Sequence, residues 1–180
     1  SRMPVAPTEP QIIPNFSLIW IGYLEDFYWY SGDLGFVREL WPCVESTLAW
    51  FEQFDADGVL RDVPYWVFSD WSMPKNDKRH AGSGGELNLR RIGGLQAASR
   101  LARALGWEDR AAHFEARLGG VIPAVRETFW DPAQGLFLDE PEGTLLGEHP
   151  SLLAVLHDVV DDEQGHEILH RLVQRDDLAR

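Results

Sequence analysis

Several features that define other protein classes are scarce in this sequence. Its 180 residues include a single cysteine, Cys43, so no internal disulfide can form and no zinc-ribbon or redox pair of cysteines exists. No apolar run approaches the roughly 20 residues of a membrane span, because residues 18–21 are soon followed by Glu25 and Asp26. The N-terminus also lacks the basic and apolar regions of a signal peptide. We therefore expect no membrane segment, and the cellular compartment stays open.

Positively charged residues are also few. The 16 lysine and arginine residues are outnumbered by 29 aspartate and glutamate residues, which gives a formal net charge of −13 at pH 7. Such a surface repels phosphate backbones and anionic lipids, so we expect neither nucleic acid nor a membrane as a partner. A neutral ligand is unaffected by this charge. Tryptophan, in contrast, is abundant at eight residues. Most of these rings belong in a core, but sugar sites also use such plates, because a pyranose ring presents C–H faces to them.

Apolar periodicity predicts an all-α fold of six helices in three antiparallel pairs. The expected helices span residues 15–30, 33–51, 83–105, 111–129, 151–160 and 161–173. Within each pair the first helix is apolar on most sides and the second on one side, so we expect an enclosed helix followed by an outer one. The expected N-terminal caps are Asp33, a capping box from Ser83 to Glu86, and a second box from Asp161 to Gln164. Gly119, Gly120 and Pro123 predict a kink or a break in the fourth helix.

Two long connections separate the helix pairs. The first, residues 55–82, holds a strand-like stretch at residues 65–68, and the second, residues 131–147, holds a turn-and-strand pattern at residues 134–138. Because the turns within pairs are short, they should gather at one end of the fold. The long connections then meet the starts of the enclosed helices at the other end, where we expect any binding site. A helical scaffold for protein binding remains an alternative, although such repeats are usually more regular.

A set of motifs along the chain resembles one enzyme family. They are Ile-Pro-Asn-Phe-Ser-Leu-Ile-Trp at 13–20, Tyr-Ser-Gly-Asp at 30–33, Phe-Val-Arg-Glu at 36–39, Asp-Gly-Val-Leu at 57–60, Trp-Val-Phe-Ser-Asp-Trp at 66–71, Phe-Trp-Asp at 129–131, Gly-Leu-Phe at 135–137 and Glu-His-Pro-Ser-Leu-Leu-Ala-Val-Leu at 148–156. Over nearly its whole length the chain is similar to the catalytic domain of bacterial α-L-rhamnosidases. The resemblance implies an inverting glycoside hydrolase with an α/α barrel of six hairpins. Its most specific elements are Trp20 and the pair Asp70-Trp71.

The resemblance also implies that this chain is a central fragment. In the family, the general acid lies upstream of the proline-rich connector, here residues 1–14, and the general base lies well downstream of the fifth helix. Residues 15–180 then form a partial barrel domain, about half of the toroid, whose acid and base lie outside the chain. A half toroid exposes a broad apolar edge unless another segment or copy covers it, so we expect self-association through that edge.

The resemblance assigns several residues to the sugar site. Trp20 and Trp71 match positions that form aromatic walls around the sugar, although both could equally be core residues. Trp66 lies in the same connection as Trp71 and is a weaker candidate. Asp70 could accept hydrogen bonds from sugar hydroxyls, although it could equally cap a turn. His149 would line the pocket.

No cofactor or metal is expected. His166 and His170 have the i, i+4 spacing of zinc ligands but no accompanying third ligand. The resemblance therefore implies part of a glycosidase that removes terminal L-rhamnose by inverting acid–base catalysis, and that we expect to be inactive as an isolated chain. The alternatives are another α/α-barrel glycosidase, of the glucan-debranching or trehalose-cleaving type, and the non-catalytic scaffold.

Overall fold

The computed structural model describes residues 2–3, 11–68, 83–141, 146–176 and 178. Its helices are α1 (Pro14–Ser31), α2 (Leu34–Glu52), α3 (Gly85–Ala104), α4 (Glu108–Phe129), α5 (Glu148–Leu156) and α6 (Asp162–Gln174). Three two-residue antiparallel pairs accompany them: β1 (Arg2–Met3) with β2 (Gln11–Ile12), β3 (Asp55–Ala56) with β4 (Val59–Leu60), and β5 (Trp130–Asp131) with β6 (Leu136–Phe137). The expected all-α hairpin fold is confirmed. Within the described residues, no helix is long and apolar enough to cross a membrane.

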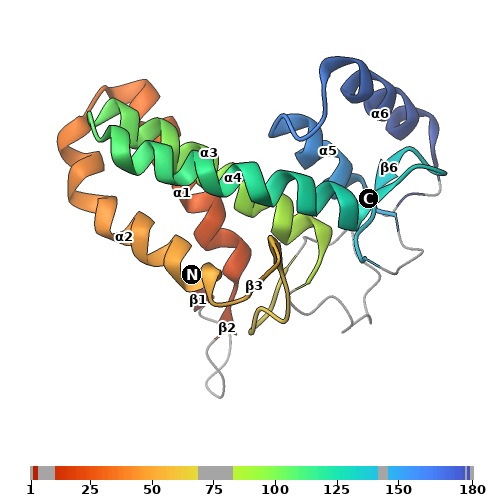
Figure 1. The fold of residues 1–180 in the computed structure, drawn as a ribbon, viewed down its shortest axis with the longest axis horizontal. Coiled ribbons are helices and arrows are strands. Elements are labelled where there is room, and N and C mark those ends of the chain that lie inside the picture. The colour runs from red at the N-terminus through yellow and green to blue at the C-terminus, as the bar shows by residue number, and fades with distance from the viewer. Residues whose placement is uncertain (1, 4–10, 69–82, 142–145, 177, 179–180) are drawn as a thin grey trace.

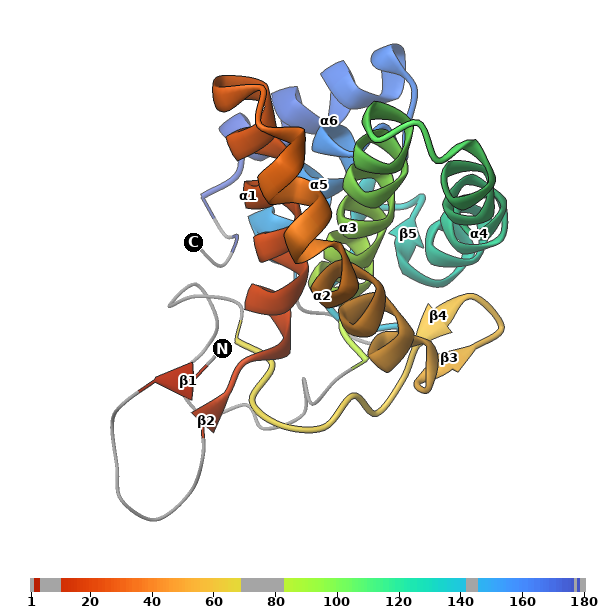
Figure 2. The same cartoon turned by 90° about the vertical axis from the view of Figure 1, so that its left-hand side faces the viewer.

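The three hairpins form an arc in which α3 is central. Helix α3 packs against α1 on one side, α5 on another, and its own partner α4 (Figures 1 and 2). Fourteen of its residues are buried, including small ones such as Ala97 and Ala98 that allow close helix contacts. Helices α2 and α6 have one buried face each, as their sequence patterns predict.

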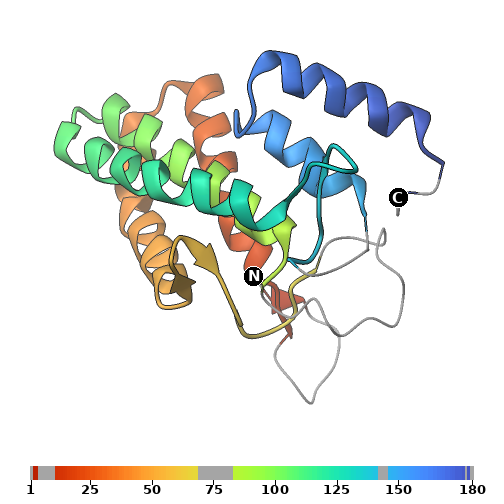
Figure 3. The same cartoon turned by 45° about the vertical axis from the view of Figure 1, so that its right-hand side comes forward.

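The short turns lie at one end of the arc and the starts of the first helices at the other. Each hairpin turn contains a residue with left-handed backbone geometry: Gly32 (φ 68°), Gly106 (φ 76°) and Asp158 (φ 51°). Glycine adopts this geometry without a steric penalty, and it ends the helix by turning the chain back. In Figure 3, α1, α3 and α5 begin toward the lower right and the turns lie toward the upper left. The expected separation of turns and helix starts is confirmed.

Two of the three predicted caps are confirmed. The Asp33 carboxylate accepts a hydrogen bond from the Phe36 N–H at 3.0 Å, and Asp161 accepts one from Gln164 at 2.8 Å. The predicted box at Ser83 is wrong. Gly84 is the N-cap of α3 and makes no side-chain cap bond, whereas the Ser83 hydroxyl accepts a hydrogen bond from the backbone N–H of Asp62 at 2.8 Å. Ser83 therefore anchors the preceding connection.

Two predictions about helix continuity need correction. Helix α4 is one helix from Glu108 to Phe129, so the predicted break is absent, whereas a kink stays a prediction. Pro123 lies on the exposed face, where water can bind the carbonyl that loses its helix hydrogen bond, while Val121 and Val125 are buried. Helix α5 begins at Glu148 and ends at Leu156, and does not extend to residue 160. The left-handed Asp158 ends it, and the apolar residues that follow are buried in the turn.

The expected alternation of enclosed and outer helices is only partly correct. Helix α3 is enclosed, but α1 exposes large aromatic side chains, among them Tyr23, Trp29 and Tyr30. Helix α5 likewise exposes Leu156. An inner helix needs neighbours on both sides, and α1 and α5 lie at the two ends of the arc. Each therefore keeps an apolar face that no described residue covers.

The short strands differ in part from the prediction. No strand forms at residues 65–68, because Tyr65 has a positive φ of 79° that breaks the extended backbone. The predicted strand pattern after Gly135 is confirmed as β6. The hairpin of β3 and β4 was not predicted, although its turn has a sequence signal. Asp57 and Gly58 have φ values of 56° and 90°, as an Asp-Gly turn between short strands requires.

Two buried polar contacts hold this hairpin against α3. The Asn88 side chain accepts a hydrogen bond from the Leu60 N–H at 2.7 Å and donates one to the Leu60 carbonyl at 3.3 Å. Asp55 pairs with Arg91, whose side chain is only 2% exposed. Burial raises the pKa of Asp55, but hydrogen bonds from Arg91 and the Gly58 N–H outweigh it, so the pKa lies below its usual value. Asp55 is therefore a carboxylate at neutral pH.

Candidate functional site

The starts of α3 and α5 are held together by one buried aspartate. The backbone carbonyl of Asp139 accepts a hydrogen bond from the Gly85 N–H at 2.9 Å, and its carboxylate accepts one from the Gly147 N–H. A side chain at Gly85 would collide with the neighbouring carbonyl of Leu138. The connection before α5 thus packs directly on the first turn of α3. We call the end of the arc where α1, α3 and α5 begin the rim.

Four aromatic side chains gather near the rim beside α1. The ring of Trp66 lies 4.8 Å from that of Phe68, which meets Phe16 edge-on at 6.4 Å. Phe16 and Trp20 share a face of α1, because they are four residues apart. The backbone N–H of Trp66 also donates a hydrogen bond to the Ile12 carbonyl at 3.2 Å, which ties this segment to the chain entering α1. The aromatic strip is Trp66, Phe68, Phe16 and Trp20.

The strip has the properties of a carbohydrate platform. Trp66 is 41% exposed, and the other three rings are half-buried. Rings held in this way present an apolar face with little loss of side-chain freedom on binding, and an indole N–H can donate to a hydroxyl. The strip can therefore pack against the C–H face of a pyranose.

The predicted site residues are only partly brought together. Trp20 and Trp66 lie on the aromatic strip. His149 is half-buried in the first turn of α5, on the other side of α3 from the strip. Asp70 and Trp71 lie outside the described residues. No sequence pattern indicated that Phe68 would join Trp66 to Phe16, because these contacts depend on how residues 65–68 return to α1.

Two buried polar side chains at the rim have unused hydrogen-bonding atoms. Asn15 is fully buried in the first turn of α1, and neither atom of its amide has a partner in the described part of the chain. Glu86, in the first turn of α3, binds the Arg90 guanidinium through Oε1 at 2.5 Å, while Oε2 is buried without a described partner. The sequence analysis did not identify either side chain as a polar residue of the site. Buried polar atoms normally find a partner in protein or ordered water.

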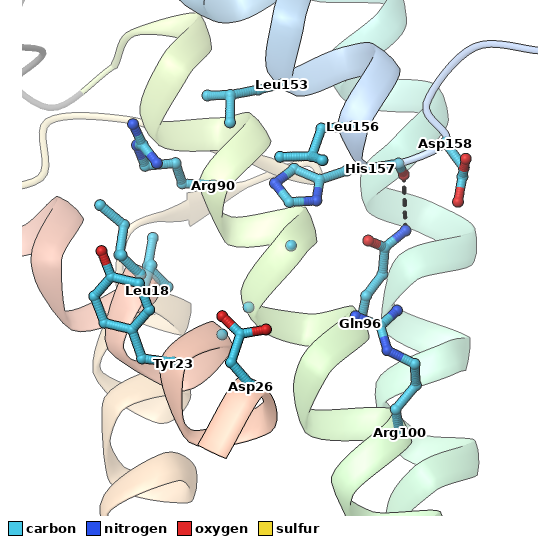
Figure 4. A pocket seen from close by; sticks show the side chains of 14 residues that line it. Leu18, Tyr23, Asp26, Arg90, Gln96, Arg100, Leu153, Leu156, His157 and Asp158 are labelled. Carbon is cyan, nitrogen blue, oxygen red and sulfur yellow. Dashed lines mark hydrogen bonds between the residues drawn. The ribbon is translucent and has the colours of Figure 1, made fainter. Parts of the chain in front are cut away.

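A cavity of about 400 Å³ lies farther along the inner face of the arc (Figure 4). It is lined by Leu18, Ile19, Gly22, Tyr23 and Asp26 of α1, by Arg90, Gly93, Gly94, Gln96 and Arg100 of α3, and by Leu153, Leu156, His157 and Asp158 at the end of α5. Its described lining includes neither the aromatic strip nor His149. The cavity was not predicted, because it depends on how three separate helices are placed.

His157 is a neutral group in the wall of this cavity. Burial, together with the positive charges of Arg90 and Arg100, lowers the pKa of His157 to about 4. Its ring packs against the backbone of Gly93, where a Cβ atom would collide with it. The Gln96 side-chain N–H donates to the His157 carbonyl at 2.8 Å and fixes the end of α5 on α3.

Two adjacent acidic residues of α1 have different surroundings. Glu25 is buried and binds Arg100 of α3, with one contact at 2.7 Å, while Arg100 has a raised pKa because of that hydrogen bond. This is the structural role that its place in an apolar helix favours. Asp26 is exposed to the cavity and has no hydrogen-bond or ion-pair partner in the described part of the chain.

Among the described residues, no group of three or more histidine, cysteine, aspartate or glutamate side chains is arranged to hold a metal ion.

Comparisons with known proteins give a consistent family and fold. The family model described as the bacterial α-L-rhamnosidase six-hairpin glycosidase domain matches residues 3–177. A GH78 family rhamnosidase of Bacillus sp. GL1 superimposes with a TM-score of 0.81 at 24% sequence identity. The superposition covers 93% of this chain and 18% of the rhamnosidase chain. A rhamnosidase from Klebsiella oxytoca with rhamnose bound gives a TM-score of 0.77 at 26% identity, over 96% of this chain and 32% of its own.

A third structure extends the fold similarity at lower identity. The α-L-rhamnosidase from Dictyoglumus thermophilum gives a TM-score of 0.71 at 16% identity, over 90% of this chain and 18% of its own. No curated protein sequence matches the chain significantly. The chain thus spans between about a fifth and a third of the length of these rhamnosidases. Its three hairpins are half of the six in the family's description.

Proposed function

The chain belongs to the bacterial α-L-rhamnosidase six-hairpin glycosidase family, and from that premise we propose that it forms part of a catalytic domain that hydrolyses terminal α-L-rhamnosides with inversion. The observation that carries this proposal is the aromatic strip at the rim, where Phe68 contacts both Trp66 and Phe16, and Trp20 follows Phe16 one turn later on the same face of α1. The bound rhamnose in the Klebsiella oxytoca enzyme is consistent with a sugar ligand for this fold.

We assign the sugar contacts to residues of the rim. The indole rings of Trp20 and Trp66 pack against the sugar ring, and Trp71 adds a third wall. Asp70 accepts hydrogen bonds from the hydroxyls, and His149 lines the far side across α3. Residues 1–14 serve as the connector from the preceding part of the protein, and residues 15–180 supply half of the barrel wall.

The general acid and base belong to parts of the longer protein outside this chain. Inversion needs two carboxyl groups about 6.5–9.5 Å apart with a water between them. The family resemblance puts that pair outside this chain, and the buried rim carboxylates hold the helix starts: Glu86 binds Arg90 through Oε1, and Asp139 accepts the Gly147 N–H. We therefore expect the isolated chain to be inactive.

Activity of the complete protein tests this proposal. We expect hydrolysis of an aryl α-L-rhamnoside with kcat/KM about 10⁴-fold above that for an aryl β-D-glucoside, because a site whose polar groups match one set of hydroxyls leaves them unpaired with another. The product anomer, followed by NMR from the first minutes, should be inverted. Preferential cleavage of trehalose or a glucan would favour the other barrel glycosidases. Absence of any glycosidase activity would favour a scaffold.

A further inference from the structure

A stacked pair of aromatic rings lies next to the aromatic strip in the chain. The rings of Trp50 and Tyr65 have centroids 6.3 Å apart and planes 20° from parallel. Trp50 belongs to α2, whereas Tyr65 directly precedes Trp66 of the strip. Tyr65 is 55% exposed and Trp50 is half-buried. We call Trp50 and Tyr65 the outer pair.

The backbone at Tyr65 is unusual for a tyrosine. Its φ of 79° lies in the left-handed region, where a bulky side chain is strained. The other described non-glycine residues with a positive φ are aspartates, which tolerate this geometry. Pro64 precedes Tyr65, and a proline followed by a residue with a φ of about +80° is typical of a type II turn, whose third position usually holds glycine. Tyrosine therefore stands where glycine would cost less free energy, which indicates a use for its ring.

Backbone hydrogen bonds on both sides hold Tyr65 in place. Before it, the backbone N–H of Asp62 donates to the Ser83 hydroxyl at 2.8 Å. After it, the backbone N–H of Trp66 donates to the Ile12 carbonyl at 3.2 Å. A ring that is fixed before binding loses little conformational entropy when a ligand packs on it. The outer pair is therefore a preorganised apolar surface that is open to solvent.

The outer pair extends the strip away from the inner helices. In Figure 2 the connection after β4 runs along the lower end of the molecule, from the end of α2 toward the chain that enters α1. Consecutive Cα atoms are about 3.8 Å apart, so a second ring linked to a sugar on Trp66 can reach Tyr65. We propose that the outer pair binds the leaving group of the hydrolysed glycoside, and that this leaving group is a neutral hexopyranose.

The chemistry of the outer pair favours a neutral sugar. Its two rings present an apolar surface to C–H groups, and the Tyr65 hydroxyl can donate to and accept from hydroxyls at the edge of a sugar. The net charge of −13 opposes an anionic leaving group. This inference rests on the proposed function, because a leaving group exists only if the protein cleaves a glycoside.

Steady-state hydrolysis of rhamnosyl-glucose disaccharides and of methyl α-L-rhamnoside by the complete protein tests the outer pair. Tyr65→Gly removes the ring, and glycine adopts a positive φ without a steric penalty, so this variant should fold. We expect it to raise KM for at least one disaccharide about fivefold to tenfold, through the loss of one ring contact. KM for methyl α-L-rhamnoside should change by less than about twofold, because that substrate has no second sugar. Tyr65→Phe keeps the ring and should retain most of the affinity for the disaccharide.

The matched control is Tyr30→Ala. Tyr30 is also an exposed tyrosine, but it lies at the end of α1 opposite the rim, so its loss should change KM for neither substrate. An equal rise in KM for both substrates in Tyr65→Gly, or no rise for any disaccharide, would overturn the inference. A rise confined to aryl α-L-rhamnosides would indicate a planar aromatic leaving group and would overturn the assignment of a sugar.

Calorimetry separates this inference from the proposed function. If the complete protein hydrolyses no rhamnoside, the proposed function fails, and the Kd of each disaccharide is compared between the unmodified protein and Tyr65→Gly. Weaker binding by Tyr65→Gly would then support the outer pair as a sugar-binding surface. Equal or undetectable binding by the two proteins would overturn it.

Discussion

At the scale of single residues, buried charges join elements that are far apart in sequence. Asp55 binds Arg91, 36 residues away, and Glu25 binds Arg100, 75 residues away. Each pair fixes a neighbouring element on α3: the β3–β4 hairpin in one case and α1 in the other. No local pattern marks these partners, which is why the sequence alone did not predict them.

Asp55→Asn should destabilise the chain by about 3 kcal/mol or more, because it leaves the buried Arg91 guanidinium without its counter-charge. The pKa of Asp55 is depressed in the folded state, so the pair contributes fully above the ordinary aspartate pKa of about 3.9. That contribution is lost as the pH falls through the lower folded value. Urea unfolding at pH 7 and pH 3 measures both effects.

The matched control for Asp55→Asn is Asp57→Asn. Asp57 is exposed in the same hairpin turn, and asparagine tolerates its left-handed geometry. It should change the free energy of unfolding by less than about 0.5 kcal/mol. Equal losses in the two variants would show that the Arg91 pair does not stabilise the hairpin.

At the scale of elements, periodicity predicted the helices because burial of one face dominates their stability. Asp33 and Asp161 were predictable as caps, since a cap needs only a bond to a backbone N–H two or three residues on. Ser83 failed as a cap because the connection before α3 offered it another backbone N–H. The contact of Trp66 with Phe68 and the inner cavity were beyond such rules, because both depend on the placement of separate elements.

Two glycines of the inner helices should respond oppositely to alanine. Gly22→Ala should stabilise the chain by about 0.5–1 kcal/mol, because alanine restricts the unfolded chain and meets no atom within 4 Å. Gly93→Ala should destabilise it by about 1–3 kcal/mol, because the new Cβ collides with the His157 ring and displaces the end of α5. Thermal unfolding of both variants measures this difference. Stabilisation by Gly93→Ala would contradict the packing of His157.

At the scale of the whole molecule, the arc leaves apolar surface at its free ends. Tyr30 at the end of α1 is 94% exposed, and Trp29 and Leu156 are also exposed. Three hairpins of a six-hairpin family leave such faces uncovered unless further hairpins or another copy pack there. The net charge of −13 opposes association of two copies, and added salt screens that repulsion.

We therefore expect the isolated chain to self-associate through the free face of α1, increasingly at high salt. Sedimentation equilibrium at 0.05 M and 0.5 M sodium chloride measures the association. Tyr30→Lys should shift the chain toward the monomer, whereas Val173→Lys, at an 82% exposed position on α6, should have little effect. A monomer under all conditions would contradict this role for the α1 face.

We propose that the aromatic strip at the rim holds the sugar that is cleaved. The most direct measurement is kcat/KM of the complete protein on an aryl α-L-rhamnoside for Trp66→Ala, compared with Trp29→Ala at the far end of α1. We predict a fall of about fivefold to tenfold for Trp66→Ala, the loss of roughly 1–1.4 kcal/mol of ring packing, and little change for Trp29→Ala. Unchanged kcat/KM in a folded Trp66→Ala protein would contradict the claim.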